Sequence, residues 1–145
     1  NESNLHYELF AQRSENPFRN YRQREVMGLG LRYLINDHAR FGFAFINEDE
    51  EDLNMINTKT DRLNIYFHDD FEIGENIFFN TTIYIQPSVD DFSDDVKSSA
   101  IFALDFEVNE QVTISLQYSR FNDNAPPMNA DKMDESISTK FSWSF

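Results

Sequence analysis

The sequence predicts an all-β fold, an antiparallel up-and-down transmembrane β-barrel of about eight strands, formed by residues 1–145 as a single domain. Three observations carry this prediction. Apolar and polar residues alternate with period two, the connections between the alternating segments are short and long in turn, and the bulky residues gather on one face. No stretch with a helical period competes with this pattern.

Each element is defined by an apolar face that is flanked by small or polar residues. In the first element Leu5 to Ala11 supply the apolar face, while His6 and Glu8 occupy the other. This alternation is typical of strands whose two faces meet different surroundings. In chain order, the eight apolar faces are formed by Leu5, Tyr7, Leu9 and Ala11; Met27, Leu29, Leu31, Tyr33 and Ile35; Phe41, Phe43 and Phe45; Leu63, Ile65, Phe67 and Phe71; Ile77, Phe79, Ile83 and Ile85; Phe102, Leu104, Phe106 and Val108; Val112, Ile114, Leu116 and Tyr118; and Ile137, Phe141, Trp143 and Phe145.

The connections between these elements alternate in length, which predicts how the elements are arranged. Three are short and hairpin-like, namely NDH (36–38), GEN (74–76) and NEQ (109–111). The other four are long and polar, and they cover residues 14–25, 47–61, 87–95 and 122–135. An up-and-down barrel then has all its short turns at one end, as in bacterial outer-membrane barrels with short periplasmic turns. An even number of strands returns both termini to the periplasmic end.

The size of the residues indicates which face points outward. Bulky Leu, Ile, Phe and Trp side chains fill one face, and Gly, Ala, Ser, Thr and Asn dominate the other. The interior of an eight-stranded barrel is only just wide enough for side chains, so the bulky face has to point toward lipid. The small face carries charges of both signs, which predicts an interior plugged by ion pairs. The residues assigned to this interior charge network are Glu8, Arg32, Arg40, Arg62, Asp105, Glu107 and Lys140.

The composition argues against several classes of function. The formal net charge is −14, from 26 acidic and 12 basic residues, and such a surface repels nucleic-acid phosphates. Without Cys the chain has no disulfide, thiolate nucleophile or Cys-ligated zinc. The acidic stretches 48–52 and 90–95 lack the spacing of an EF-hand loop and are interpreted as a solvated rim. Divalent-cation binding there, bridging to lipopolysaccharide phosphates, is the open alternative to the prediction of no metal and no cofactor.

The histidines are the remaining candidates for catalysis. His68, Asp69 and Asp70 are adjacent, but the alternation places His68 and Asp70 inside and Asp69 outside, so the three side chains do not converge. They are interpreted as an interior salt bridge that ends the membrane span. A lipid-modifying enzyme would need a histidine beside a serine at the external rim, whereas His6 and His38 fall at the periplasmic end. The sequence therefore predicts a protein that is not an enzyme and has no catalytic residues.

The C-terminal residues resemble a known signal. Phe145 ends the chain after Ile137, Phe141 and Trp143, which is similar to the C-terminal signal that the barrel assembly machinery reads in bacterial outer-membrane proteins. A narrower resemblance covers roughly residues 21–145. There GLGLRYLINDHARFGF, IYIQPSVDDFSDDVKSSAIFALDFEVNEQVTISLQYSRFNDNAPP and STKFSWSF look like the salt-induced outer-membrane protein family, a YdiY-like family with a domain of unknown function.

This resemblance implies an outer-membrane β-barrel of a Gram-negative bacterium, with no established activity, ligand or catalytic residue. Members of the family usually have further strands before the matched region. The alternative fold is therefore that these residues are the C-terminal part of a barrel of about 10–12 strands, within the range known for such barrels.

Together these observations predict an integral outer-membrane β-barrel that is non-enzymatic, either a structural component or a subunit of a larger outer-membrane complex. Its expected partners are outer-membrane lipid and lipopolysaccharide, the barrel assembly machinery during insertion, and other outer-membrane proteins. Two alternatives stay open: a passive pore, which requires a wider barrel, and a lipid-modifying enzyme.

Overall fold

The computed structural model describes residues 4–16, 21–128 and 130–144, which form one antiparallel sheet of eight strands. The strands are β1 (Leu5–Asn16), β2 (Tyr21–Leu34), β3 (Arg40–Asp52), β4 (Asn57–Gly74), β5 (Ile77–Pro87), β6 (Val96–Asn109), β7 (Val112–Asp123) and β8 (Met133–Trp143). The prediction of an all-β, up-and-down antiparallel fold with eight strands is confirmed. Within the described ranges, no helix is long and apolar enough to cross a membrane.

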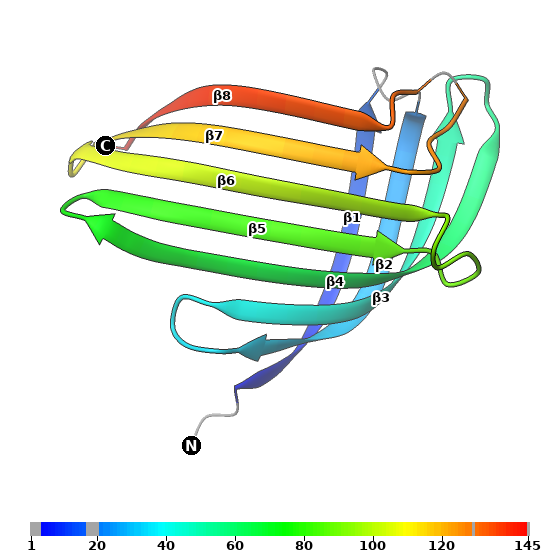
Figure 1. Cartoon of the computed structure of the whole chain (residues 1–145), viewed down its shortest axis with the longest axis horizontal. Helices are drawn as coiled ribbons and strands as arrows, with labels where there is room; N and C mark the ends of the chain where they lie inside the picture. The colour runs from blue at the N-terminus through cyan, green and yellow to red at the C-terminus, as the bar shows by residue number, and fades with distance from the viewer. Residues whose placement is uncertain (1–3, 17–20, 129, 145) are drawn as a thin grey trace.

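The strands follow one another in the sheet in the order in which they occur in the sequence, from β1 to β8. Figure 1 shows that the sheet is strongly curved: β4 to β8 run across the view, whereas β1 and β2 run steeply behind them. The sheet therefore has a concave and a convex face. Among the described residues, β1 and β8 do not pair with each other, and each forms an edge of the sheet.

The strand register places apolar residues beside apolar residues on the convex face. Leu29 of β2 lies opposite Phe45 of β3, and Phe41 lies opposite Phe67 of β4. Every strand exposes large apolar side chains there, and Leu9 of β1 is 86% exposed. The alternation in the sequence thus predicted correctly which residues share a face, because side chains one residue apart point to opposite sides of a strand.

The apolar band on the convex face has a limited height. On β3 it ends at Phe45, since the next residues on the same face are Asn47, Asp49 and Glu51. Asp49 pairs with Lys59 of β4 at 2.9 Å, so the two strands continue beyond the band as a polar hairpin. Asp69 of β4 interrupts the convex face, where it lies opposite Thr81 of β5.

The polar hairpin corrects the assignment of residues 47–61 to a long loop. β3 continues to Asp52 and β4 begins at Asn57, so only residues 53–56 connect them. Asp52 Oδ1 accepts hydrogen bonds from the N–H groups of Asn54 and Ile56, both at 2.8 Å, and Met55 has a left-handed φ of 65°. The pattern hid these strand ends because both of their faces are polar. The strands beside 14–25 and 122–135 likewise extend into segments assigned to loops.

The three short turns form where the sequence predicted them. Asn36 Oδ1 accepts hydrogen bonds at 2.8 and 2.6 Å from the N–H groups two and three residues later. Asn109 repeats this arrangement at 2.9 and 3.1 Å, and Asn76 adopts a φ of 60° in the remaining turn. Asparagine suits all three places, because its side chain can bond to the following backbone and it tolerates the left-handed conformation.

Glycines on β2 and β3 allow side chains to lie flat on the concave face. Gly30 packs against Ala44, and Gly42 lies under the ring of Tyr66, which occupies the space that a side chain at Gly42 would need. The Tyr66 hydroxyl donates to Glu8 Oε2 of β1 at 2.7 Å. Tyr66 of β4 thereby reaches across β3 and β2, and it joins the N-terminal strand to the middle of the sheet.

Candidate functional site

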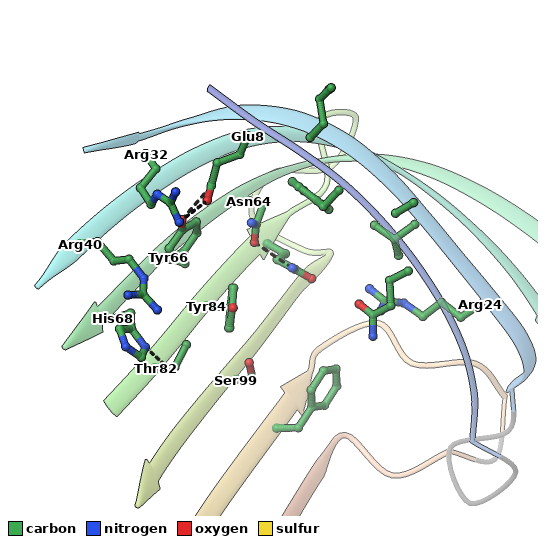
Figure 2. A pocket seen from close by; sticks show the side chains of 17 residues that line it. Glu8, Arg24, Arg32, Arg40, Asn64, Tyr66, His68, Thr82, Tyr84 and Ser99 are labelled. Carbon is green, nitrogen blue, oxygen red and sulfur yellow. Dashed lines mark hydrogen bonds and ion pairs between the residues drawn. The ribbon is translucent and has the colours of Figure 1, made fainter. Parts of the chain in front are cut away.

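The concave face carries two groups of polar side chains. The first, called the ion-pair cluster below, consists of Arg24, Glu48, Glu50, Arg62, Asp95, Lys97 and Asp123. The second surrounds a cavity of about 800 Å³, called the arginine cavity below, whose polar lining includes Glu8, Arg32, Arg40, Tyr66, His68, Thr82, Tyr84 and Ser99. Figure 2 shows the residues of this cavity projecting from several strands into one space.

Glu48 lies at the centre of the ion-pair cluster, and its side chain is buried. Its carboxylate pairs with Arg24 of β2 at 2.6 Å, with Lys97 of β6, and with Arg62 Nε of β4 at 3.5 Å. A buried charge without a partner is strongly unfavourable, so three cations around one carboxylate make its burial possible. The contacts also connect β3 to β6, two strands that are not neighbours in the sheet.

Three further carboxylates complete the cluster. Lys97 also pairs with Glu50 at 3.0 Å and lies 3.9 Å from Asp123 of β7. Arg62 pairs with Asp95 at 2.8 Å and donates to two backbone carbonyl oxygens at 3.2 and 3.3 Å. Because Asp95 immediately precedes β6, the cluster also fixes the end of the β5–β6 connection.

The cluster keeps Glu48 ionised. Burial alone would raise the pKa of this carboxyl group, but the positive charges of Lys97, Arg24 and Arg62 outweigh burial and lower the pKa from 4.5 to about 2. Glu48 lies past the end of the apolar band, in the polar hairpin. A carboxylate with so low a pKa accepts protons poorly near neutral pH, so the cluster is better suited to holding strands together than to general-base catalysis.

One side of the arginine cavity is built on Glu8. Arg32 of β2 pairs with Glu8 at 3.3 Å, and the Tyr66 hydroxyl donates to the other oxygen of the same carboxylate. The ion pair and the hydrogen bond together engage both oxygens of Glu8 and draw β1, β2 and β4 together. Figure 2 shows these three side chains side by side at the upper rim of the cavity.

The other side of the cavity holds His68, one of the three adjacent residues that the sequence singled out. His68 Nδ1 lies 2.8 Å from Thr82 Oγ1, and His68 Nε2 lies 3.2 Å from Asp70 Oδ2. His38, in the β2–β3 turn, also reaches Asp70 at 3.4 Å, while Asp69 points to the convex face. No histidine in the described part of the chain is hydrogen-bonded to a serine.

The residues predicted for the interior charge network are divided between different places. Glu8 and Arg32 pair directly, as described above. Arg62 belongs to the ion-pair cluster, and Arg40 points into the arginine cavity. These four share the concave face, as the alternation predicted, but they do not form one continuous network.

The other three predicted residues lie on the last strands. Asp105 of β6 accepts a hydrogen bond from Asn80 at 2.6 Å, and Lys140 of β8 donates to Gln117 at 2.9 Å. Glu107 is exposed to solvent. Asp105 and Lys140 are therefore paired with neutral amide groups of neighbouring strands.

Reasoning from the sequence placed Arg62 on the inward face but not Glu48, Glu50 and Lys97, although the sequence contains a signal for them. Glu48 and Glu50 occupy positions with the same parity as Gly42 and Ala44, so they continue the inward face of β3. Lys97 has the same parity as the other inward residues of β6. Following the alternation past the last apolar residue would have placed these charges inside.

The residues of the C-terminal signal lie on the convex face of β8. Ile137, Phe141 and Trp143 are 75%, 70% and 67% exposed. Their exposure leaves them accessible from outside the sheet, as recognition by another protein would require. Phe145 lies outside the residues that the structure describes.

The described residues contain no group of three or more His, Cys, Asp or Glu side chains that could hold a metal ion. The acidic stretch 90–95 contributes Asp95 to the ion-pair cluster, and 48–52 contributes Glu48 and Glu50. Five carboxylates of these two stretches have cationic side chains as partners, namely Glu48, Asp49, Glu50, Glu51 and Asp95.

Together the fold and the two polar groups define a class of protein: an eight-stranded up-and-down sheet with an apolar convex face and a charged concave face. The chain matches the family described as "Protein of unknown function, DUF481" over residues 2–145, and it belongs to that family. The predicted membership in a family of unknown function is thus confirmed. Neither the curated proteins nor the solved structures contain a match to the chain.

Proposed function

We propose that the protein is a non-enzymatic β-barrel protein of the bacterial outer membrane, a structural component or a subunit of a larger outer-membrane complex. One observation carries this proposal: all eight strands expose large apolar side chains on the convex face, while the charges gather on the concave face. Continuous apolar surfaces of this extent are rare on soluble monomers, and they suit a barrel wall that faces lipid.

The chemistry at the ends of the strands supports a membrane-spanning orientation. Trp143 and Tyr33 are large, exposed aromatic residues near the end that carries the short turns, where barrels have a girdle of aromatic residues. At the other end the polar hairpin of β3 and β4 extends past the apolar band. In this orientation both termini are periplasmic, and the polar hairpin lies at the height of lipopolysaccharide headgroups.

A barrel wall in lipid needs partners for its edge strands, because lipid offers no hydrogen-bonding groups. β1 and β8 therefore have to pair in the membrane, either with each other or with strands that complete a wider barrel. Insertion of such a barrel involves the barrel assembly machinery, and the exposed face of Ile137, Phe141 and Trp143 is suited to that recognition.

Heat-modifiability tests the proposal. The chain is refolded in detergent micelles and run on a denaturing gel with and without boiling. A faster band in the unboiled sample is expected, because closed barrels resist the detergent until they are heated. Equal mobility in both lanes, together with monomeric behaviour in buffer without detergent, would contradict a membrane barrel.

The absence of enzymatic activity is part of this proposal. His68 lies against the Thr82 hydroxyl and Asp70, and among the described residues it is not hydrogen-bonded to a serine. We expect a variant with alanine in place of His6, His38 and His68 to leave the lipid A profile of expressing cells unchanged, as judged by mass spectrometry. An altered profile would support the alternative of a lipid-modifying enzyme.

A passive pore is the second candidate, and two observations favour it. Within residues 4–16, 21–128 and 130–144 the edges β1 and β8 have no pairing with each other, which leaves room for a wider barrel, and the concave face already contains a cavity of about 800 Å³. Single-channel recordings in planar bilayers distinguish the two functions. Steady conductance steps indicate a pore, whereas a silent membrane with heat-modifiable protein indicates a plugged barrel.

A further inference from the structure

Arg40 has no anionic partner among the residues that the structure describes. It begins β3, and Figure 2 shows its guanidinium group pointing into the arginine cavity, between Arg32, Tyr84 and His68. Within the described parts of the chain, its side chain makes neither an ion pair nor a hydrogen bond. A guanidinium group that points into a cavity can donate up to five hydrogen bonds, so Arg40 is suited to anchor an anion that enters there.

Further donors line the same cavity. Arg32 lies beside Arg40, and its Nη1 atom pairs with Glu8 at 3.3 Å. Tyr84 of β5 and Ser99 of β6 lie opposite each other in the sheet register, and both line the cavity. Neither hydroxyl group forms a hydrogen bond within the described chain. The cavity thus offers two guanidinium groups and two hydroxyl groups at one place.

The nearby carboxylates are already engaged. Glu8 accepts from Arg32 and Tyr66, and Asp70 lies against His68 and His38. The cavity therefore has an excess of donors and positive charge, within a chain whose net charge is −14. An interior that existed only to be plugged would be expected to pair each cation, as the ion-pair cluster does.

We propose that the arginine cavity binds a small molecule through its phosphate or carboxylate group, with Arg40 as the main anchor. The planar guanidinium group matches the two oxygens of such an anion, and charge-assisted hydrogen bonds of this kind are strong. Arg32, Tyr84 and Ser99 supply the further donors that surround it. This site goes beyond the proposed function, because a structural barrel needs no ligand.

The test measures the nuclear magnetic resonance signals of the arginine side chains while an anion is added. The full chain is labelled with ¹⁵N-arginine, refolded in detergent micelles, and titrated with sodium phosphate at constant ionic strength. We expect the Nε–Hε signals of Arg40 and Arg32 to shift and to saturate. A second titration with sodium acetate distinguishes a site for phosphate from a site for carboxylate, since the anion that fits saturates at the lower concentration.

The variant Arg40→Gln removes the anchor, and Arg120→Gln is its matched control. Arg120 carries the same charge but pairs with Glu135 at 3.7 Å on the other face of the sheet. We expect Arg40→Gln to abolish saturation at the Arg32 signal, and Arg120→Gln to leave it unchanged. Tyr84→Phe removes one donor and is expected to weaken binding by roughly tenfold.

Three results would overturn the proposal. The first is a linear response of all arginine signals to both anions, which indicates general screening of charge. The second is an equal loss of binding in Arg40→Gln and Arg120→Gln. The third is the absence of any shift at Arg40 and Arg32. Heat-modifiability of Arg40→Gln is measured in parallel, and if that variant does not fold, Tyr84→Phe decides the outcome.

Discussion

Gly42 is the residue whose lack of a side chain has the widest effect. The ring of Tyr66 occupies the space next to its Cα, and from there the hydroxyl group reaches Glu8 on β1. A single hydrogen atom at this position thus allows one tyrosine to join β4 to the first strand. Close packing of an aromatic ring on glycine is possible only where the backbone can be approached directly.

The variant Gly42→Ala is therefore expected to be destabilised. A methyl group would displace the ring and break the Tyr66–Glu8 hydrogen bond, at a cost of roughly 2–3 kcal/mol. Unfolding by urea in detergent measures the effect. Gly74→Ala is the control, because its methyl group would only touch Ile77 at an ordinary 3.8 Å. Equal stability of the two variants would show that the ring does not need this glycine.

Glu48 makes the stability of the ion-pair cluster depend on pH. Its pKa is lowered from 4.5 to about 2, so the folded state favours the ionised form. The stabilisation is complete above about pH 4.5 and is lost as the pH falls toward 2; at its largest it is on the order of 3 kcal/mol. Urea unfolding as a function of pH measures it. Glu48→Gln should be less stable at neutral pH and should lack most of this dependence.

At the scale of single residues, the sequence predicted the face of the sheet on which each side chain lies. It did not predict which side chain each one would pair with. The parity of Arg62 and Glu8 predicted that they share a face, which in the structure is the concave one. Their partners depend on contacts between distant segments, and Lys97 and Glu48 are 49 positions apart. No local pattern contains the information that these two will meet, because it arises from the curvature and register of the whole sheet.

At the scale of the strands, the apolar alternation predicted correctly that eight strands exist. It was less successful at predicting the residues at which they end. The short turns were correct because asparagine has a specific local role there. The ends of β3 and β4 were not recognised, since Asp49 and Lys59 make the outer face polar while the sheet continues. Strand ends outside an apolar band are held by cross-strand pairs, and these are invisible until the register is known.

A substitution at Ile137 of β8 tests whether the convex face contacts lipid or water. The side chain is 75% exposed, so in water Ile137→Lys would change the free energy of unfolding very little. Facing lipid, the same change is expected to destabilise the fold by about 2–4 kcal/mol near the middle of the membrane. Urea unfolding in lipid vesicles measures the difference.

The control is Leu53→Lys, in the loop that joins β3 to β4. Leu53 is also exposed, at 49%, but it lies beyond the apolar band. The substitution Leu53→Lys is expected to change the free energy of unfolding very little in vesicles. If Ile137→Lys is as well tolerated as Leu53→Lys, the convex face does not contact lipid.

At the scale of the whole molecule, the unpaired edges are the feature that the sequence could not settle. A barrel of eight strands would bring β1 and β8 to the spacing of neighbouring strands, about 4.8 Å. Among the described residues β1 and β8 are not paired with each other. Curvature depends on the summed twist of all the strands, and a period-two pattern is the same in narrow and wide barrels.

Spin labels on the two edges test this arrangement. The chain has no cysteine, so Tyr7→Cys together with Ile137→Cys gives a specific pair of labels. We expect strong dipolar broadening in the electron paramagnetic resonance spectrum of this pair when the refolded chain is heat-modifiable, because a closed barrel of this chain has to join β1 to β8. The pair Leu31→Cys and Phe43→Cys, which are partners in the β2–β3 register, should show broadening in every folded form. A heat-modifiable sample without broadening for the edge pair would mean that strands from outside these eight complete the barrel.

The order of the strands also has a kinetic consequence. Since every strand pairs with its neighbour in the sequence, each step of folding closes only a small loop and adds one strand to an existing edge. Hairpins such as β4–β5 and β6–β7 can form early and independently, within microseconds in water. The free edge of β1 can pair only with β8, far away along the chain, or with a strand outside it. That final pairing would set the rate of assembly, and a factor that brings these edges together would act as the catalyst of folding.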